Sequence, residues 1–338
     1  MSEDRPMIAE KHTKPLKKKA RTRVKLSEAP PILSINDLIE IGHSVKLYKN
    51  IDSVMIWRVT PYLEELNNLI GMQDLKESIF YQVLYYVQGM HQRNDTDEYL
   101  HTMIYGSPGT GKTTVAHLIG KIYQALGILS KKGTFKIAHR DDFVAGYLGQ
   151  TAIKTEKLLK SCIGGVLFID EVYSLAPRDN DRDSFSKEAL DTLTAFLSEH
   201  KKDFCCIAAG YEDDVENCFF AMNQGLKRRF PWVHRIGKYS PTELALIFNK
   251  MVKEINWDTA IKQKDLENII SSNINIFKNA GGDIETFITK CKISHATRVI
   301  SLGNEHKFIL TIEDITNGIN LVKKYRKIED QVIPSFYT

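Results

Sequence analysis

The sequence predicts an α/β domain built on a parallel sheet, followed by a small helical domain. From residue 69 to residue 238 the pattern alternates between amphipathic helices and short apolar strands. Residues Gly165–Asp170 form an apolar run, which is typical of a central parallel strand buried on both faces. Beyond residue 238 the strand patterns mostly vanish. Together these observations favour a doubly wound α/β domain at 69–238 and a helical domain at 239–338.

The first 30 residues read as a disordered basic tail. They hold nine Lys or Arg against four Asp or Glu, whereas the whole chain carries a net charge of +4. The run Lys14–Arg23 fits a nuclear-import signal, a phosphate-binding arm or a solubilising tail. Residues 31–68 have helical apolar spacing and are interpreted as an N-terminal extension without chemistry of its own.

The elements of the α/β domain and the helical domain follow from periodicity and capping signals. Ser240–Glu243 forms a capping box with Pro at the first helical position, and Thr311 caps a later helix. The predicted helices are Met72–Gly89, Lys112–Leu126, Ser186–His200 and Ile312–Tyr325, and the predicted strands are Thr102–Tyr105, Phe135–Ile137, Gly165–Asp170 and Phe204–Ala209.

A glycine-rich loop follows the first predicted strand and opens the next helix. Residues Gly106–Thr113 read Gly-Ser-Pro-Gly-Thr-Gly-Lys-Thr, which is the full phosphate-loop pattern in its proper context. Glycines let backbone N–H groups turn onto phosphate oxygens, and the helix N-terminus favours an anion. Lys112 is expected to reach the β- and γ-phosphates of ATP, and Thr113 to ligate Mg²⁺. The expected phosphate-binding residues are Pro108, Gly109, Thr110, Gly111, Lys112, Thr113 and Thr114.

Two acids stand at the end of the apolar strand that follows. Asp170 is expected to hold Mg²⁺, directly or through water. Glu171 is expected to orient and deprotonate the attacking water. Two acids at a strand end are weak evidence alone, but with the phosphate loop they predict an ATP hydrolase that uses Mg-ATP.

Composition excludes several other classes of protein. No run of 18 apolar residues is present, and the first ten residues lack the apolar core of a secretory signal. The five cysteines form no Cys-x-x-Cys pair, and the scattered histidines show no zinc-ligand spacing. An intracellular protein, cytoplasmic or nuclear, with no membrane segment is therefore expected.

From about Leu66 to Tyr239 the chain resembles the CbxX/CfqX group of AAA+ ATPases, which includes the red-type Rubisco activases. The resemblance weakens beyond Tyr239. The strings that carry it are Leu69–Met72, Gly106–Ala116, Tyr147–Ala152, Gly165–Glu171, Ala209–Tyr211 and Asn223–Phe230.

The resemblance implies roles for three more groups of residues. Ile70-Gly71 matches the loop on the adenine side of the nucleotide, although an ordinary helix start would look the same. Arg229 matches the arginine finger that reaches a neighbouring subunit's γ-phosphate, and Arg228 replaces the usual serine, so either arginine can serve. Tyr147 and Leu148 match the pore loop that grips polypeptide in remodelling rings. The alternative for Tyr147 is a core residue in a turn.

The chain departs from the family pattern at two positions. Tyr211 stands at the sensor-1 position, where AAA+ proteins usually carry Asn or Thr. The sensor-2 arginine is missing from the stretch 282–285, which reads Gly-Asp-Ile-Glu. Lys290, Lys292 or Arg298 on the same predicted helix are candidates to replace it.

These features lead to one main functional prediction and two alternatives. The main prediction is a hexameric ring ATPase that remodels or unfolds a protein client. The first alternative is an ATP-dependent loader or remodeller of nucleic-acid complexes, in which the basic tail binds the nucleic acid. The second is a nucleotide-dependent scaffold without turnover, against which the intact Glu171 argues.

Overall fold

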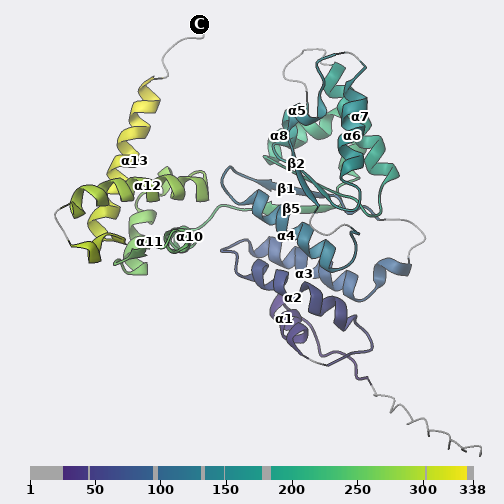
Figure 1. Cartoon of the computed structure of the whole chain (residues 1–338), viewed down its shortest axis with the longest axis horizontal. Coiled ribbons are helices and arrows are strands. Elements are labelled where there is room, and N and C mark those ends of the chain that lie inside the picture. Colours follow the sequence, from purple (N-terminus) through teal and green to yellow (C-terminus); the bar gives the residue numbers. More distant parts are fainter. Residues whose placement is uncertain are drawn as a thin grey trace, which may run out of the picture.

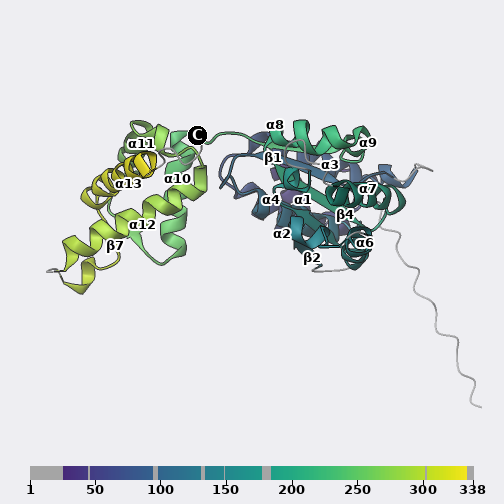
Figure 2. The same ribbon diagram turned by 90° about the horizontal axis from the view of Figure 1, so that it is seen from above.

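The computed structural model describes residues 26–44, 46–93, 98–130, 134–147, 149–176, 184–300 and 303–332. Within them the chain forms an α/β part around a five-stranded sheet and a second, mainly helical part (Figure 1). The view from above in Figure 2 shows the two parts side by side. The predicted fold class, a parallel-sheet domain followed by a small helical domain, is confirmed.

All neighbouring strands of the large sheet run parallel, in the order β2-β3-β4-β1-β5. The carboxyl ends of parallel strands meet at one edge of a sheet, so the loops that follow them are neighbours in space. The strands are β1 (Thr102–Gly106), β2 (Phe135–Ala138), β3 (Val166–Ile169), β4 (Cys205–Gly210) and β5 (Trp232–Ile236).

Helices cover both faces of this sheet. In β4, Cys205, Ile207 and Ala209 belong to one hydrophobic core, whereas Cys206 and Ala208 belong to the other. This alternation is the two-residue period of a strand, and burial on both faces explains why the central strands are apolar throughout. The helices that cover the first face are α1 (Ile35–His43), α2 (Ser53–Asn67), α3 (Gln73–Val87) and α4 (Lys112–Ala125). On the second face lie α5 (Arg140–Phe143), α6 (Thr151–Ser161) and α7 (Ser184–Glu199).

The two N-terminal helices share the core of the sheet. Helix α1 begins at a capping box between Ser34 and Asp37, which satisfies two backbone N–H groups that the first turn leaves free. Leu38 of α1 and Ile56 and Leu63 of α2 are fully buried in the same core as α3 and α4. These helices therefore pack through the sheet's own core, and they form no core of their own.

The sequence predicted the central elements well and missed the edge strand. The seven helices and strands predicted between residues 72 and 209 end within two residues of the observed bounds. Strand β5 was not predicted. It is an edge strand in which Val233 and Arg235 are exposed, so it lacks the long apolar run that marks a buried strand.

The helical part has its own core. The predicted capping box is confirmed, because the Ser240 and Glu243 side chains bond each other's backbone N–H and Pro241 occupies the first turn. Phe248 and Phe287 lie at the centre of the core, with ring centroids 5.3 Å apart. The elements are α10 (Pro241–Glu254), α11 (Gln263–Ser271), α12 (Ala280–Val299), α13 (Ile312–Val332) and a two-stranded pair of β6 (Asp258–Thr259) with β7 (Ile309–Leu310).

A buried charged cluster fastens α13 to α12. Asp314 is fully buried and accepts hydrogen bonds from the Arg298 guanidinium at 2.8 and 2.9 Å and from the Thr311 N–H at 2.8 Å. Its carboxylate also lies 3.0 Å from Nδ1 of His295. Burial alone would raise the pKa of Asp314, but these donors hold the pKa well below its ordinary value.

We expect Asp314→Asn to destabilise the helical part by about 3–5 kcal/mol, because it removes one partner of a buried ion pair. Since the pKa of Asp314 is depressed, its contribution is complete above the unfolded value of about 3.9 and is lost as the pH falls through the folded value. Urea unfolding at pH 7 measures the effect, and Glu313→Gln in the same helical turn is the control. A stability equal to that of the control would show that the cluster does not hold the helices together.

Candidate nucleotide-binding site

The phosphate loop connects the end of β1 to the start of α4. Gly109 and Gly111 have φ angles of +67° and +91°, which side chains on L-residues rarely adopt. A Cβ at Gly109 would also collide with the backbone of Asn279. The loop can therefore turn its N–H groups toward one centre at the N-terminus of a 14-residue helix, where a phosphate group binds favourably.

Lys112 is folded back onto this loop. Its Nζ donates to the carbonyl oxygens of Gly106 and Ser107, at 3.0 Å each. The pKa of Lys112 is lowered because the ammonium is partly buried, and the nearby charges of Asp170 and Glu171 act in the opposite direction. The cation therefore lies close to both the phosphate loop and the two acids.

The remaining threonines of the loop occupy different positions. The Thr110 hydroxyl donates to the Ser107 carbonyl oxygen at 2.8 Å, so it stabilises the turn. Thr113 is half-buried in the first turn of α4, and Thr114 is exposed.

Asp170 and Glu171 follow β3 at the same edge of the sheet. Asp170 accepts the Glu171 N–H at 2.9 Å, and Glu171 has a left-handed backbone with φ +47°. Such a conformation costs a non-glycine residue about 1–2 kcal/mol, so the surrounding contacts must hold it in place. The Thr113 hydroxyl and the Asp170 carboxylate are oxygen donors of the kind that Mg²⁺ prefers, and they fit that ion.

The loop predicted on the adenine side lies against the phosphate loop. Gly71 and Met72 both have left-handed backbones, with φ +68° and +59°. A Cβ at Gly71 would lie 2.6 Å from Oε1 of Glu243 in α10. A Cβ at Gly111 would lie 3.4 Å from the methyl group of Met72. Ile70, which precedes this turn, is half-buried at the same place.

The helical part touches the phosphate loop at two points that the sequence did not predict. The Tyr239 hydroxyl donates to the Thr110 carbonyl oxygen at 3.0 Å. The Gly281 N–H, in the first turn of α12, donates to the Gly109 carbonyl oxygen at 3.0 Å. In the sequence, only the adjacent glycines at 281–282 indicate that α12 approaches the phosphate loop closely. No sequence pattern indicates the contact made by Tyr239.

The three proposed sensor-2 replacements lie elsewhere on α12. The Lys290 ammonium lies 3.8 Å from the centroid of the Tyr325 ring, and the Lys292 ammonium lies 5.8 Å from that of Trp257. Arg298 is bound to Asp314. Lys290 is roughly 12 Å along the helix axis from its first turn. Helix α12 thus meets the phosphate loop with glycine backbone and not with a cation.

Arg228 and Arg229 lie at the opposite edge of the sheet. They precede β5, and the first residue of β5 pairs with the first residue of β1. The phosphate loop follows the last residue of β1, so roughly 16 Å of strand separates the two arginines from this loop. Arg229 donates to the Ser198 hydroxyl and the Gly225 carbonyl oxygen, whereas Arg228 is exposed. Burial lowers the pKa of the neighbouring His101 to about 4. Neither arginine can reach the nucleotide bound by its own chain.

Tyr147 is 74% exposed between α5 and α6, so it is not a residue of the hydrophobic core. Its neighbours Gly146 and Gly149 have open space where a Cβ would stand. Leu148 and the basic run within residues 1–25 lie outside the described residues.

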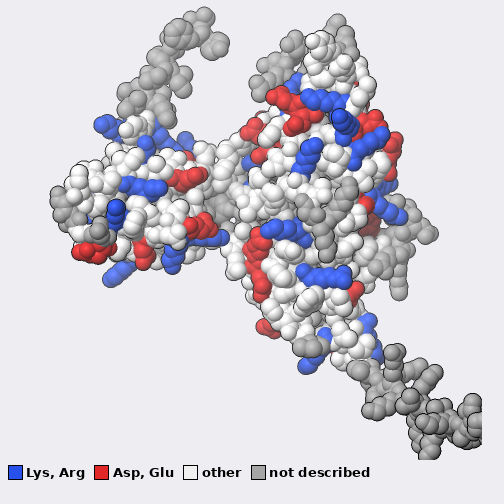
Figure 3. Space-filling view, viewed as in Figure 1, with Lys and Arg blue, Asp and Glu red and all other residues white. Residues whose placement is uncertain are grey.

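On the face shown in Figure 3, blue and red side chains are intermingled over both parts. No helix among the described residues is long and apolar enough to span a membrane.

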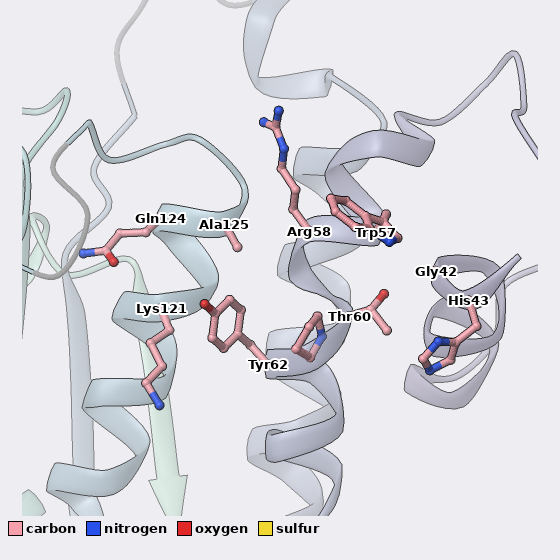
Figure 4. A pocket seen from close by; sticks show the side chains of 10 residues that line it. Gly42, His43, Trp57, Arg58, Thr60, Tyr62, Lys121, Gln124 and Ala125 are labelled. Carbon is pink, nitrogen blue, oxygen red and sulfur yellow. The ribbon is translucent and has the colours of Figure 1, made fainter. Parts of the chain in front are cut away.

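A separate hollow of about 740 Å³ lies at the other end of α4. Figure 4 shows Trp57 and Arg58 of α2, His43 of α1 and Lys121 of α4 around it. Lys121 is paired with Glu65, at 3.1 Å. None of the predicted nucleotide-binding residues lines this hollow, so it is distinct from the phosphate site.

The strand order, the phosphate loop after β1 and the acids after β3 define a P-loop ATPase domain. Residues 102–228 match the model of the ATPase family associated with various cellular activities (AAA). A putative CfxQ-like protein of Acanthamoeba polyphaga mimivirus is 36% identical over 80% of this chain and 68% of that protein. The chloroplastic ribulose bisphosphate carboxylase/oxygenase activase of Cyanidioschyzon merolae is 38% identical over 58% of this chain and 68% of its own.

A solved structure shows the same fold. The AAA domain of FIGL-1 in complex with ADP has a TM-score of 0.56 and 16% identity, covering 78% of this chain and 89% of that one. The chain belongs to the AAA family of nucleotide-binding ATPases, in the CbxX/CfqX group.

We expect Lys112→Ala to weaken ATP binding at least about tenfold, because hydrogen bonds to a charged group contribute about 1.5–3 kcal/mol. Titration with a fluorescent ATP analogue measures this change. Lys121→Ala removes a lysine from the same helix and is the matched control. Equal affinities of the two variants would exclude Lys112 from the phosphate site.

Proposed function

We propose that this chain hydrolyses Mg-ATP as a hexameric ring and uses the reaction to remodel a protein client. One observation carries the proposal of a ring. The phosphate loop, Asp170 and Glu171 gather at one edge of the sheet, whereas Arg228 and Arg229 lie at the opposite edge. A single chain therefore holds both halves of a hydrolytic site but cannot bring them together.

Each residue then has a defined task. Loop N–H groups and Lys112 hold the phosphates, and Glu171 accepts the proton of the water that attacks the γ-phosphorus as the bond to the β-phosphate oxygen breaks. Mg²⁺, when held by Thr113 and Asp170, neutralises charge on the phosphates. The exposed Arg228, or Arg229 once freed from Ser198, approaches the γ-phosphate of the next chain and stabilises the charge that develops there.

A protein client is supported by two observations. The name of the relative from Cyanidioschyzon merolae describes an activase of another enzyme, ribulose bisphosphate carboxylase/oxygenase. The exposed Tyr147 offers apolar area and one hydrogen bond at low entropic cost, which suits contact with varied polypeptide segments.

Mixed rings test whether the site is shared between chains. Glu171→Gln removes the base but keeps the fingers, and Arg228→Ala or Arg229→Ala removes a finger but keeps the pocket. We expect Glu171→Gln, and the variant of whichever arginine is the finger, each to lose about 10²-fold or more of the ATPase rate when alone. Mixing Glu171→Gln with the finger variant should restore part of the rate, because some junctions then pair an intact finger with an intact pocket.

The control for this test is Lys227→Ala, which removes an exposed cation of the same turn and should leave the rate unchanged. The arginine whose loss is rescued by mixing is the finger. If neither variant gains activity in the mixture, or if a dilute monomer is fully active, the shared site is wrong.

A photo-crosslinking amino acid at position 147 tests the protein client. Replacing the exposed Tyr147 should change the melting temperature and the basal ATPase rate little, because surface substitutions usually shift stability by less than about 0.5 kcal/mol. In the Glu171→Gln chain held with ATP, we expect crosslinks to polypeptide from position 147. The same probe at Tyr81, another exposed tyrosine, should give none. Crosslinks to nucleic acid alone would favour a nucleic-acid remodeller.

A further inference from the structure

Lys76 of α3 closes the turn that joins α2 to α3. The residue is only 8% exposed, although its side chain carries a charge. Its ammonium donates to the carbonyl oxygens of Asn67 and Leu69, at 3.0 and 2.6 Å. Asn67 is the last residue of α2, and the end of a helix favours a cation because its last carbonyl groups lack partners within the helix. Lys76 therefore holds both the end of α2 and the start of the turn.

The burial of Lys76 is unusual for a lysine. Lysine is almost never buried unless its ammonium is paired. Burial lowers the pKa of Lys76, and the negative charge of Glu243 in α10 acts in the opposite direction. Glu243 lies against the same turn, because a Cβ at Gly71 would be 2.6 Å from its Oε1. The cation is thus enclosed between the turn that it binds and the first turn of the helical part.

The turn has a backbone that must be held in place. Gly71 and Met72 are both left-handed, and this conformation is unfavourable for a residue with a side chain, such as Met72. The Met72 carbonyl oxygen accepts the Lys76 N–H at 3.0 Å. The methyl group of Met72 lies against the phosphate loop, 3.4 Å from where a Cβ of Gly111 would stand. Lys76 therefore binds this turn with its backbone and with its side chain, beside the phosphate loop.

The bond from Lys76 to Leu69 sets the direction of one peptide group. The C=O and N–H of a trans peptide unit point in opposite directions, and the described residues contain no cis peptide bond. The Leu69 carbonyl oxygen is directed at the Lys76 ammonium, so the N–H of Ile70 points away from that ammonium. Within the described part of the chain, this N–H has no hydrogen-bond partner. Ile70 therefore offers a donor whose direction is fixed by Lys76.

A donor at this place would distinguish the two purine bases. The N1 atom of adenine accepts a hydrogen bond, whereas the N1 atom of guanine carries a hydrogen and donates one. If the peptide group between Leu69 and Ile70 turned over, its carbonyl oxygen would replace the N–H and would suit guanine. The ammonium of Lys76 opposes this rotation, because the carbonyl oxygen would lose its charged partner. A site with a fixed donor rejects the wrong base, because polar groups are then left unpaired.

From these contacts we propose that Lys76 is a positioning residue for nucleotide binding, which fixes the Ile70 N–H as a donor and thereby selects adenine over guanine nucleotides. This role rests on the proposed ATPase function and on the expected place of Ile70 and Gly71 on the adenine side of the nucleotide. Lys76 acts on the base only through the turn. Its loss should therefore change the base preference and leave phosphate binding unchanged.

Calorimetric titration of the full chain with Mg²⁺ and ADP, GDP or inorganic pyrophosphate separates the base from the phosphates. The wild-type chain should bind ADP at least about tenfold more tightly than GDP. Lys76→Met keeps the apolar stem and removes the ammonium. It should weaken ADP binding about tenfold and GDP binding by less than about threefold, so that most of the preference is lost. Pyrophosphate has no base and should bind both chains equally.

Lys154→Met is the matched control. The Lys154 ammonium also donates to two backbone carbonyl oxygens, those of Asp141 at 2.5 Å and Val144 at 2.9 Å, at the end of α5. The variant therefore loses the same kind of bonds at a turn away from the phosphate loop. All three dissociation constants should be unchanged.

An unchanged ratio of ADP to GDP affinity in folded Lys76→Met would overturn the role of Lys76, as would an equal loss for ADP, GDP and pyrophosphate. If Lys76→Met does not fold, the wild-type chain decides, because GDP binding as tight as ADP binding also overturns this role. Lys76→Gln, which keeps a shorter donor, should then show an intermediate preference. The ATPase proposal fails separately, if the wild-type chain binds neither nucleotide or if Glu171→Gln turns over at the wild-type rate.

Discussion

The common direction of the five strands governs where chemistry can occur in this chain. Because the strands are parallel, every loop that leaves a strand's carboxyl end reaches the same edge, where Lys112, Asp170 and Tyr211 meet. Segments that enter a strand, such as the turn before β5 with Arg228 and Arg229, are confined to the other edge. The common direction of the strands thus brings the residues of the phosphate site together and keeps the two arginines away from them.

The positions in the fold that were predicted correctly from the sequence are those encoded over a few neighbouring residues. The phosphate loop, the acids after β3 and the capping box at Ser240 are each local, because one turn or strand end sets their geometry. The contacts that were missed join residues far apart in sequence, such as Gly281 to Gly109 and Tyr239 to Thr110. No local sequence pattern indicates such contacts, because each of the two residues alone fits the pattern of its own helix or loop.

The arginine pair shows the same limit in another form. The sequence alone does not show which of Arg228 and Arg229 would act as the finger, because both have the charge and length that a finger requires. The packing of the folded chain places the two arginines in different environments. The turn of α9 (Gln224–Lys227) directs Arg229 onto Ser198, while Phe230 enters the core and Arg228 is left exposed. The distinction depends on α7, which the pattern Arg-Arg-Phe does not contain.

The phosphate loop is one point at which the two parts of the chain touch. The helical part bonds the carbonyl oxygens of Gly109 and Thr110, whereas an incoming phosphate binds the N–H groups of the same loop. The two interactions use opposite faces of the same peptide groups, so they do not compete directly. Any rotation of those peptides that improves phosphate binding must also move the carbonyl groups that hold Tyr239 and the first turn of α12. Among the described residues, the contact through which nucleotide binding could affect the position of α12 is thus made by the backbone of the phosphate loop and not by a cation of α12.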